Sequence, residues 1–149
     1  MNVRWSLRRL DQLSPAELHD LLRLRQDVFI VEQDCAFHEI DGRDPQAWHL
    51  LGVDETGRLI AAARIFEPGA LTEEAVIGRV VVALPARGSG LGRRLMQEAM
   101  RRVDELAPNA PMRVAAQQHL EDFYASLGFR TVGKSYVEDG ILHVDMVRP

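Results

Sequence analysis

The sequence has little of several features that mark other classes of protein. Cys35 is the only cysteine, which excludes an intramolecular disulfide and any metal site built from several cysteines. Residues 1–10 are charged and carry no apolar run, so we expect no signal peptide. No stretch approaches the roughly 20 apolar residues of a membrane-spanning helix. These absences favour a cytoplasmic protein with no membrane partner.

An excess of basic residues is also lacking. The formal net charge is −4, whereas a nucleic-acid-binding protein normally carries a basic surplus, so we expect no nucleic-acid partner. The 149 residues fit one domain over residues 1–149, and 46% of them are hydrophobic, which is enough for an ordinary core.

The first half of the chain begins with a strand and a capped helix. Trp5 and Leu7 alternate with polar residues, as in a short strand. Ser14, Pro15 and Glu17 then form the start of a helix, because serine caps, proline suits the first turn and glutamate completes the capping box. From Glu32 the order weakens into a loop rich in turn residues. Three strands are predicted to follow, over residues 48–53, 59–66 and 75–82.

The second half predicts two helices and three strands. Apolar residues recur every three or four positions from Leu91 to Leu106, which indicates one helix with a continuous apolar stripe. A strand over 112–116 and a short helix over 120–127 precede two final strands near 129–137 and 141–147, and Gly128 suits the end of the short helix. The order predicts a mixed α/β sheet with helices packed on it.

The junction between the 75–82 strand and the following helix has the chemistry of an anion site. Gly88, Gly90 and Gly92 allow a ligand to approach the backbone, and the first amides of a helix have no internal partner. Arg87 and Arg93 flank them, where the helix dipole disfavours cations unless an anion is bound. A solvated turn is the alternative. A dinucleotide fingerprint and a Walker loop fit less well, because Arg93 stands where the last glycine belongs and no G-K-[ST] ending is present.

These residues resemble a known family. The run Val80-Val81-Val82, followed by Arg87-x-x-Gly90-x-Gly92, is similar to motif A of the GNAT N-acetyltransferases. Further on, Gln117 and the segment 123–129, Phe-Tyr-Ala-Ser-Leu-Gly-Phe, resemble the later motif of that family, with Gln117 in place of its usual asparagine. Segments of the first half and the run Glu138-Asp139-Gly140 resemble the ElaA-like branch.

The resemblance implies a fold and a set of cofactor contacts. The sheet would be GNAT-like: mixed, mostly antiparallel, flanked by helices and splayed between two parallel central strands. Acetyl-CoA would lie in that splay as a co-substrate, and no metal would be needed. Tyr124 would be the general acid that protonates the departing CoA thiolate; a core aromatic is the alternative. The residues implied in acetyl-CoA binding are Val80, Val81, Val82, Arg87, Gly88, Ser89, Gly90, Leu91, Gly92, Arg93 and Gln117.

The acceptor side is less defined. Its candidate residues are Glu32, Asp41, Arg64 and Arg79, with ordinary surface or interstrand pairing as the alternative for each. Glu32 or Asp41 would contribute to a base or hold a cationic amine. His38, His49 and His143 are further candidate bases, although isolated histidines are more often structural, and no partner accompanies Cys35 as a nucleophile.

The predicted function is an N-acetyltransferase that moves the acetyl group of acetyl-CoA to a primary amine by direct attack in a ternary complex. The acceptor, a small-molecule amine or a peptide or protein amine, stays open, as does the oligomeric state, with a homodimer among the alternatives. A non-catalytic acyl-CoA-binding or regulatory module of the same fold is the first rival function. Acyl-homoserine-lactone synthesis is a weaker one, suggested by the segment from Arg25 to Phe29.

Overall fold

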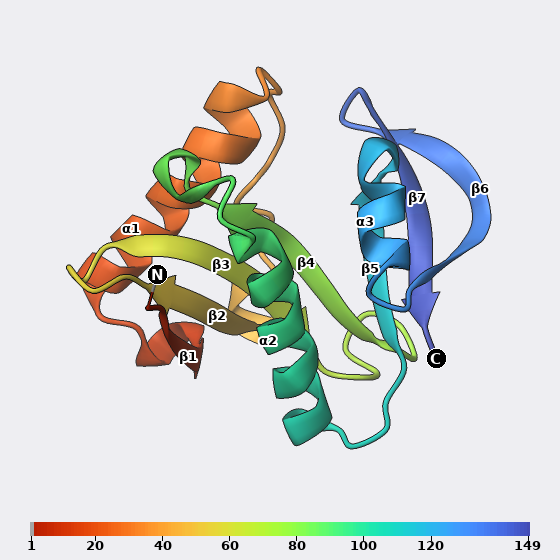
Figure 1. Ribbon diagram of the computed structural model, residues 1–149, viewed down its shortest axis with the longest axis horizontal. Helices are drawn as coiled ribbons and strands as arrows, with labels where there is room; N and C mark the ends of the chain where they lie inside the picture. The colour runs from red at the N-terminus through yellow and green to blue at the C-terminus, as the bar shows by residue number, and fades with distance from the viewer. Residues whose placement is uncertain (1) are drawn as a thin grey trace.

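The computed structural model describes residues 2–149, which form one seven-stranded sheet with helices on both faces (Figure 1). The strands lie in the order β1-β2-β3-β4-β5-β7-β6, and only β4 and β5 pair in parallel. The strands are β1 (Arg4–Arg9), β2 (Trp48–Val53), β3 (Leu59–Phe66), β4 (Ala75–Val82), β5 (Met112–Gln117), β6 (Arg130–Glu138) and β7 (Ile141–Arg148). The α-helices are α1 (Pro15–Arg25), α2 (Leu91–Leu106) and α3 (Glu121–Ala125). The predicted mixed, mostly antiparallel sheet is confirmed.

The sheet is open at its centre. β4 and β5 pair at two positions, Ala75 with Met112 and Val76 with Arg113. Beyond these positions the two strands diverge toward their carboxyl ends, as Figure 1 shows. The later β4 residues therefore have backbone groups toward β5 that no neighbouring strand pairs, and such groups need another partner. The predicted splay between two parallel central strands is confirmed.

The two long helices cover opposite faces of the sheet. Ala61 and Ala63 of β3 belong to the core cluster that contains the buried residues of α2. Ala62, between them, packs with Leu21 of α1 and Val81 of β4. Successive strand residues point to opposite faces, so α1 and α2 lie on different sides of the same strands. We call these sides the α1 face and the α2 face.

The start of α1 is as predicted, whereas its end is not. The Ser14 hydroxyl accepts from the Glu17 amide over 3.1 Å, and the Glu17 carboxylate accepts from the Ser14 amide over 2.9 Å, which completes the capping box. After Arg25 the chain continues as a π-helix over Gln26–Glu32, where the apolar spacing gave no warning of a change. In a π-helix, each amide bonds to the carbonyl five residues earlier, as Gln33 N–H does to Val28 O over 3.2 Å.

The second half follows the predicted order with small shifts at the ends of elements. In α2, Leu91, Leu95, Ala99 and Val103 are buried, so the predicted apolar stripe is confirmed. The predicted 120–127 helix is shorter, because a 3₁₀ turn over 118–120 leads into α3. Gly128 follows with a φ of +94°, the left-handed conformation that glycine adopts without strain. Within residues 2–149, no helix is long and apolar enough to cross a bilayer.

Candidate functional site

The glycine-rich segment lies at the amino-terminal end of α2. Gly90 is the residue before the helix, with a φ of +77°, and Gly88 has a φ of +83°, so both adopt a backbone that side chains disfavour. A Cβ atom placed on Gly88, Gly90 or Gly92 would meet no atom within 4 Å. The backbone here therefore borders open space, as a surface that receives a ligand must.

The amides at this end of α2 are available to an anion. The first backbone hydrogen bond of the helix runs from Arg94 N–H to Gly90 O over 3.2 Å, so the amides of residues 91–93 precede the helical pattern. Unpaired amides and the positive end of the helix dipole attract a negative group such as a pyrophosphate. Side chains contribute less than the sequence suggested: Leu91 and Val81 are buried, and Ser89 donates to Ala86 O. Only the backbone of Leu91 and Val81 is available to a ligand.

The arginines of the loop are held by protein groups. Arg87 donates to Val82 O over 3.1 Å and to the Glu32 carboxylate over 2.7 Å. Arg93 donates to the Ser126 hydroxyl over 2.5 Å, and its guanidinium lies 5.8 Å from the centre of the Phe123 ring. Glu32, which the sequence suggested for the acceptor side, is thus paired with the glycine-rich loop before α2.

Tyr124, on α3, lies in the core cluster that contains the buried residues of α2. Its side chain is 7% exposed, and the rings of Phe123 and Phe129 meet it edge-on at 5.2 and 6.0 Å. Burial raises the pKa of Tyr124 to about 12, so the phenol keeps its proton throughout the neutral range. Gln117 is the last residue of β5, at the carboxyl-terminal end of the strand that borders the opening.

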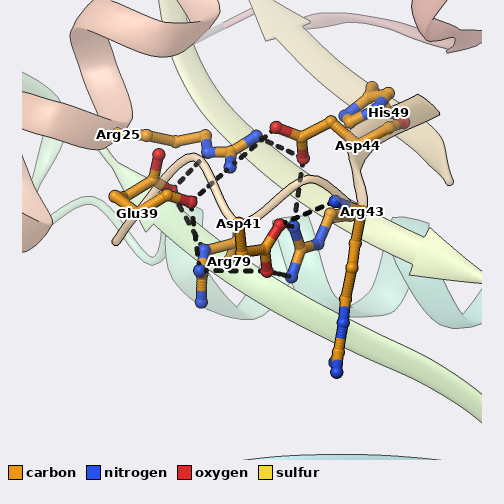
Figure 2. Close-up of polar contacts among 8 residues, drawn as sticks. Arg25, Glu39, Asp41, Arg43, Asp44, His49 and Arg79 are labelled. Atoms are coloured by element: carbon orange, nitrogen blue, oxygen red, sulfur yellow. Dashed lines mark hydrogen bonds and ion pairs between the residues drawn. The ribbon is translucent and has the colours of Figure 1, made fainter. Parts of the chain in front are cut away.

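A network of charged side chains lies on the α1 face, beside the start of the opening (Figure 2). Arg25, only 1% exposed, donates from Nε to Glu39 Oε1 over 2.6 Å and from Nη1 to Asp44 Oδ1 over 3.0 Å. Burial alone would lower the pKa of Arg25, but the hydrogen bonds that it donates to the two carboxylates raise it. Burial raises the pKa of Asp44, but its contacts with Arg25 and Arg64 together lower it by more, so the pKa of Asp44 is below its ordinary value. This pairing ties the loop that contains Glu39 and Asp44 to the end of α1.

The remaining members of the network come from β3, β4 and the same loop. Arg64 donates to both carboxylate oxygens of Asp41 at 2.9 Å and to Asp44 at 3.0 Å. Arg79 donates to Glu39 Oε1 at 2.9 Å and lies 3.4 Å from Asp41. Burial raises the pKa of Asp41, but hydrogen bonds from Arg64 and the Arg43 amide lower it to about 2. Asp41 is therefore a permanent anion and a weak base at neutral pH.

Arg79 occupies a strained position. Its φ is +47°, which is costly for any residue other than glycine, and it lies at a bulge where β4 has one more residue than β3. Its guanidinium stacks 5.5 Å from the Phe37 ring centre, and burial together with the charge of Arg64 lowers its pKa. The bulge directs Arg79 to the α1 face, within the part of β4 that β5 does not pair.

The sequence predicted only some of the residues in this network. Asp41, Arg64 and Arg79 were candidates, and the structure brings these three together, but Arg25, Glu39 and Asp44 were missed. One feature of the sequence could have indicated this network: Arg25 lies on the same helix face as Leu18 and Leu21, so a charged side chain stands where an apolar one is expected. His49 is buried, its pKa is lowered by that burial, and its Nε2 lies 2.9 Å from Asp44 O. In the described part of the chain, no three His, Cys, Asp or Glu side chains are arranged to hold a metal ion.

The chain is similar to known proteins over most of its length. A family model described as an acetyltransferase (GNAT) domain matches residues 19–148. The chain belongs to the GNAT acetyltransferase family. It is 39% identical over 148 residues to the protein ElaA of Escherichia coli, which covers 98% of this chain and 96% of ElaA. This GNAT chain therefore lies in the ElaA-like branch, as its motifs suggested.

Solved structures agree with the observed fold. A crystal structure of an acyl-CoA N-acyltransferase from Pseudomonas aeruginosa superposes with a TM-score of 0.94 at 38% identity, over 99% of this chain and 100% of that one. The crystal structure of E. coli ElaA superposes with a TM-score of 0.91 at 38% identity, over 99% and 100% of the two chains. Membership of the GNAT family implies an acyl-CoA co-substrate. The open glycine backbone and free helix amides fit its pyrophosphate.

Proposed function

We propose that this protein transfers the acetyl group of acetyl-CoA to a primary amine, by direct attack of the amine in a ternary complex. The observation that carries the proposal is the opening between β4 and β5, which starts beside the charged network and leads to the glycine loop of α2. One continuous site can then hold the pyrophosphate at the helix and the thioester between the strands. Holding amine and thioester together supplies much of the rate enhancement.

The chain's own groups would share the binding as follows. Amides of Gly88 to Gly92 and Arg93 hold the pyrophosphate. Backbone groups of Val80 and Val82, which β5 does not pair, hold the pantetheine arm and polarise the thioester carbonyl. Gln117 borders the same opening from β5 and is placed to contact this arm.

Tyr124 would act on the departing sulfur. A phenol with a pKa of about 12 is a weaker acid than a cysteine-like thiol, whose pKa is about 8.5. Complete proton transfer to the thiolate is therefore unfavourable, and the phenol serves better as a hydrogen-bond donor that stabilises the developing charge. Donating this hydrogen bond does not require the phenol to lose its proton, which fits a buried tyrosine that stays protonated.

The acceptor would approach from the α1 face, past Arg79 and Asp41. Both are partly exposed, at 23% and 22% of their side chains, whereas Arg64 lies deeper in the same network. We assign Asp41, Arg64 and Arg79 to holding the wall of the acceptor site. Glu32 reaches that site only if its pair with Arg87 opens.

A turnover screen tests the function directly. The intact protein is incubated with acetyl-CoA and a library of small amines, polyamines, amino acids and peptides, and free thiol is measured against time. Amine-dependent thiol release with a matching acetylated product supports the proposal. Saturable acetyl-CoA binding without turnover of any amine would indicate the non-catalytic module instead. Thiol release that needs S-adenosylmethionine and a longer acyl donor would indicate acyl-homoserine-lactone synthesis.

A further inference from the structure

The proposed reaction needs a group that removes a proton from the amine. A lysine-like ammonium has a pKa of about 10.4, so producing the neutral nucleophile at pH 7 costs about 4.6 kcal/mol. The carboxylates of the charged network do not meet this need, because Asp41 is held as an anion by two arginines and Glu39 and Asp44 are buried in ion pairs. The acceptor for the proton must lie elsewhere on the opening.

The three histidines that the sequence singled out differ in their surroundings. His49 is 1% exposed and beneath the network, so no substrate reaches it. His38 is an exposed residue of the loop after the π-helix, with no contact that fixes its ring. His143 is half-buried near the start of β7, and two contacts fix it: its Nδ1 lies 2.7 Å from Ile141 O, and its ring stacks on Tyr136 with centres 5.9 Å apart.

These contacts determine which nitrogen of His143 carries the lone pair. A carbonyl oxygen only accepts, so Nδ1 of His143 is the donor to Ile141 O, and the neutral ring then keeps its lone pair on Nε2. The Tyr136 hydroxyl donates to Asp145 over 2.6 Å, and Arg113 donates to Asp145 over 3.0 Å. The stacking partner is thus itself anchored, so the imidazole is held with Nε2 in a set direction.

Strand register places His143 one strand away from the opening, on the far side of β5. Val76 pairs with Arg113, so, once the extra residue of the bulge is counted, the Val80–Val81 segment of β4 is level with the Ala116–Gln117 end of β5. Gln117 in turn is directly opposite His143 on β7. Just past the β4 bulge, therefore, β4 lies on one side of the opening and Gln117 on the other, with His143 next to Gln117.

His143 also faces the correct side of the sheet. Val144 and Met146 of β7 belong to the core with α2, so the intervening residues His143 and Asp145 point to the α1 face. Ala116 of β5 points to the same core, which directs Gln117 to the α1 face as well. The loop after α1 reaches this side, because the Cys35 thiol lies 3.0 Å from Asp139 O in the β6–β7 turn. An amine entering from the α1 face meets His143 without crossing the sheet.

We propose that His143 is the general base of the acetyl transfer, through Nε2; this inference rests on the proposed function. Nε2 of His143 takes one proton from the bound ammonium, the neutral nitrogen bonds to the thioester carbonyl carbon, and the nitrogen then loses its second proton to solvent. The carbon–sulfur bond then breaks, the sulfur leaves with its electron pair as a thiolate that Tyr124 stabilises, and solvent protonates it. The imidazolium returns its proton to solvent. The charged and titratable groups around His143 are Tyr136 and Glu138 on β6, Asp145 on β7 and, through Asp145, Arg113 on β5.

The test is the pH profile of the His143→Gln variant, with the amine of highest turnover from the screen as the probe. Glutamine keeps a donor for Ile141 O but cannot take the proton. We expect kcat at pH 7 to fall about 10²- to 10⁴-fold, with the acid limb of the kcat/KM profile lost and acetyl-CoA affinity unchanged by calorimetry. His38→Gln is the matched control and should behave as wild type.

Two further results separate the alternatives. An arylamine that is already neutral at pH 7 should lose far less rate in His143→Gln than the alkylamine does, because no proton must be removed before attack. If the variant keeps the wild-type acid limb, or loses the same factor with both amines, His143 is structural and the inference is overturned while the proposed function stands. If the wild-type protein acetylates no amine at all, the proposed function fails and this role fails with it.

Discussion

Arg87 and Glu32 form an ion pair of 2.7 Å between the glycine loop and the last residue of the π-helix. One end of the pair belongs to the proposed pyrophosphate site and the other to the segment that follows α1. The two residues are 55 positions apart in the chain. A polyanion at the loop must therefore compete with Glu32 for the guanidinium of Arg87.

Glu32→Gln should tighten acetyl-CoA binding. The side chains are 35% and 39% exposed, and a pair of this exposure contributes up to about 1 kcal/mol, which corresponds to about a fivefold lower Kd. Isothermal titration at low salt measures it. Glu73→Gln removes the same charge from an exposed site outside the loop and should leave the Kd unchanged. A Kd that rises in Glu32→Gln would mean that Glu32 orients Arg87 for the ligand.

Gly92→Asp should separate folding from cofactor binding. The φ of Gly92 lies outside the left-handed range and its Cβ position is open, so the change adds no strain. An acidic residue in the first turn of a helix stabilises it by about 0.3–1 kcal/mol, so the melting temperature without ligand should stay equal or rise. The same carboxylate repels a pyrophosphate, so the thermal shift given by acetyl-CoA should disappear.

The control for this variant is Gln97→Glu, which adds one negative charge to an exposed position of α2 beyond the loop. It should keep the full thermal shift. An undiminished shift in Gly92→Asp would place the pyrophosphate somewhere other than the amino-terminal end of α2.

Tyr124→Phe should lower kcat by about 10- to 100-fold with acetyl-CoA affinity unchanged. A hydrogen bond to a charged group contributes about 1.5–3 kcal/mol, and the phenyl ring preserves the edge contacts with Phe123 and Phe129. Because the pKa of Tyr124 is raised to about 12, neither enzyme should show an alkaline decline from this group below pH 10. Wild-type turnover by the variant, with chemistry shown to be rate-limiting, would make Tyr124 a packing residue.

Asp41 should make the folded protein sensitive to acid. Its pKa is about 2 in the folded state against an ordinary 3.8, so the folded state favours the carboxylate. The resulting stability is present above pH 4 and is lost as the pH falls from about 4 to about 2. Urea unfolding at a series of pH values should show this loss in wild type.

Asp41→Asn should reduce that acid dependence while lowering stability at pH 7 by about 1–3 kcal/mol, since Arg64 loses one of its two anionic partners and keeps only Asp44. Asp104→Asn makes the same chemical change at an exposed position of α2 and should keep the wild-type acid dependence. An identical pH dependence in Asp41→Asn and wild type would assign the acid sensitivity to other carboxylates.

The sequence by itself determined the local elements and the glycine-rich loop before α2. Capping by Ser14 and Glu17, the stripe of α2 and the spacing of Gly88, Gly90 and Gly92 depend on neighbouring residues, so their consequences are readable from the chain. The motifs in their order also sufficed to identify the family, because that pattern combines a strand, a loop and a helix at fixed offsets.

The tertiary structure alone decided the α1 side of the site. Arg25 is 14 and 19 positions from its partners Glu39 and Asp44, and Cys35 is 104 positions from Asp139, so no local spacing predicts that they meet. The π-helix after α1 and the bulge at Arg79 each change the direction in which the following side chains point. No pattern of hydrophobic residues in the sequence marks either of them. That His143 lies next to Gln117, at the open end of β5, depends on the register of β5 and β7, and register is a property of paired strands rather than of either strand alone.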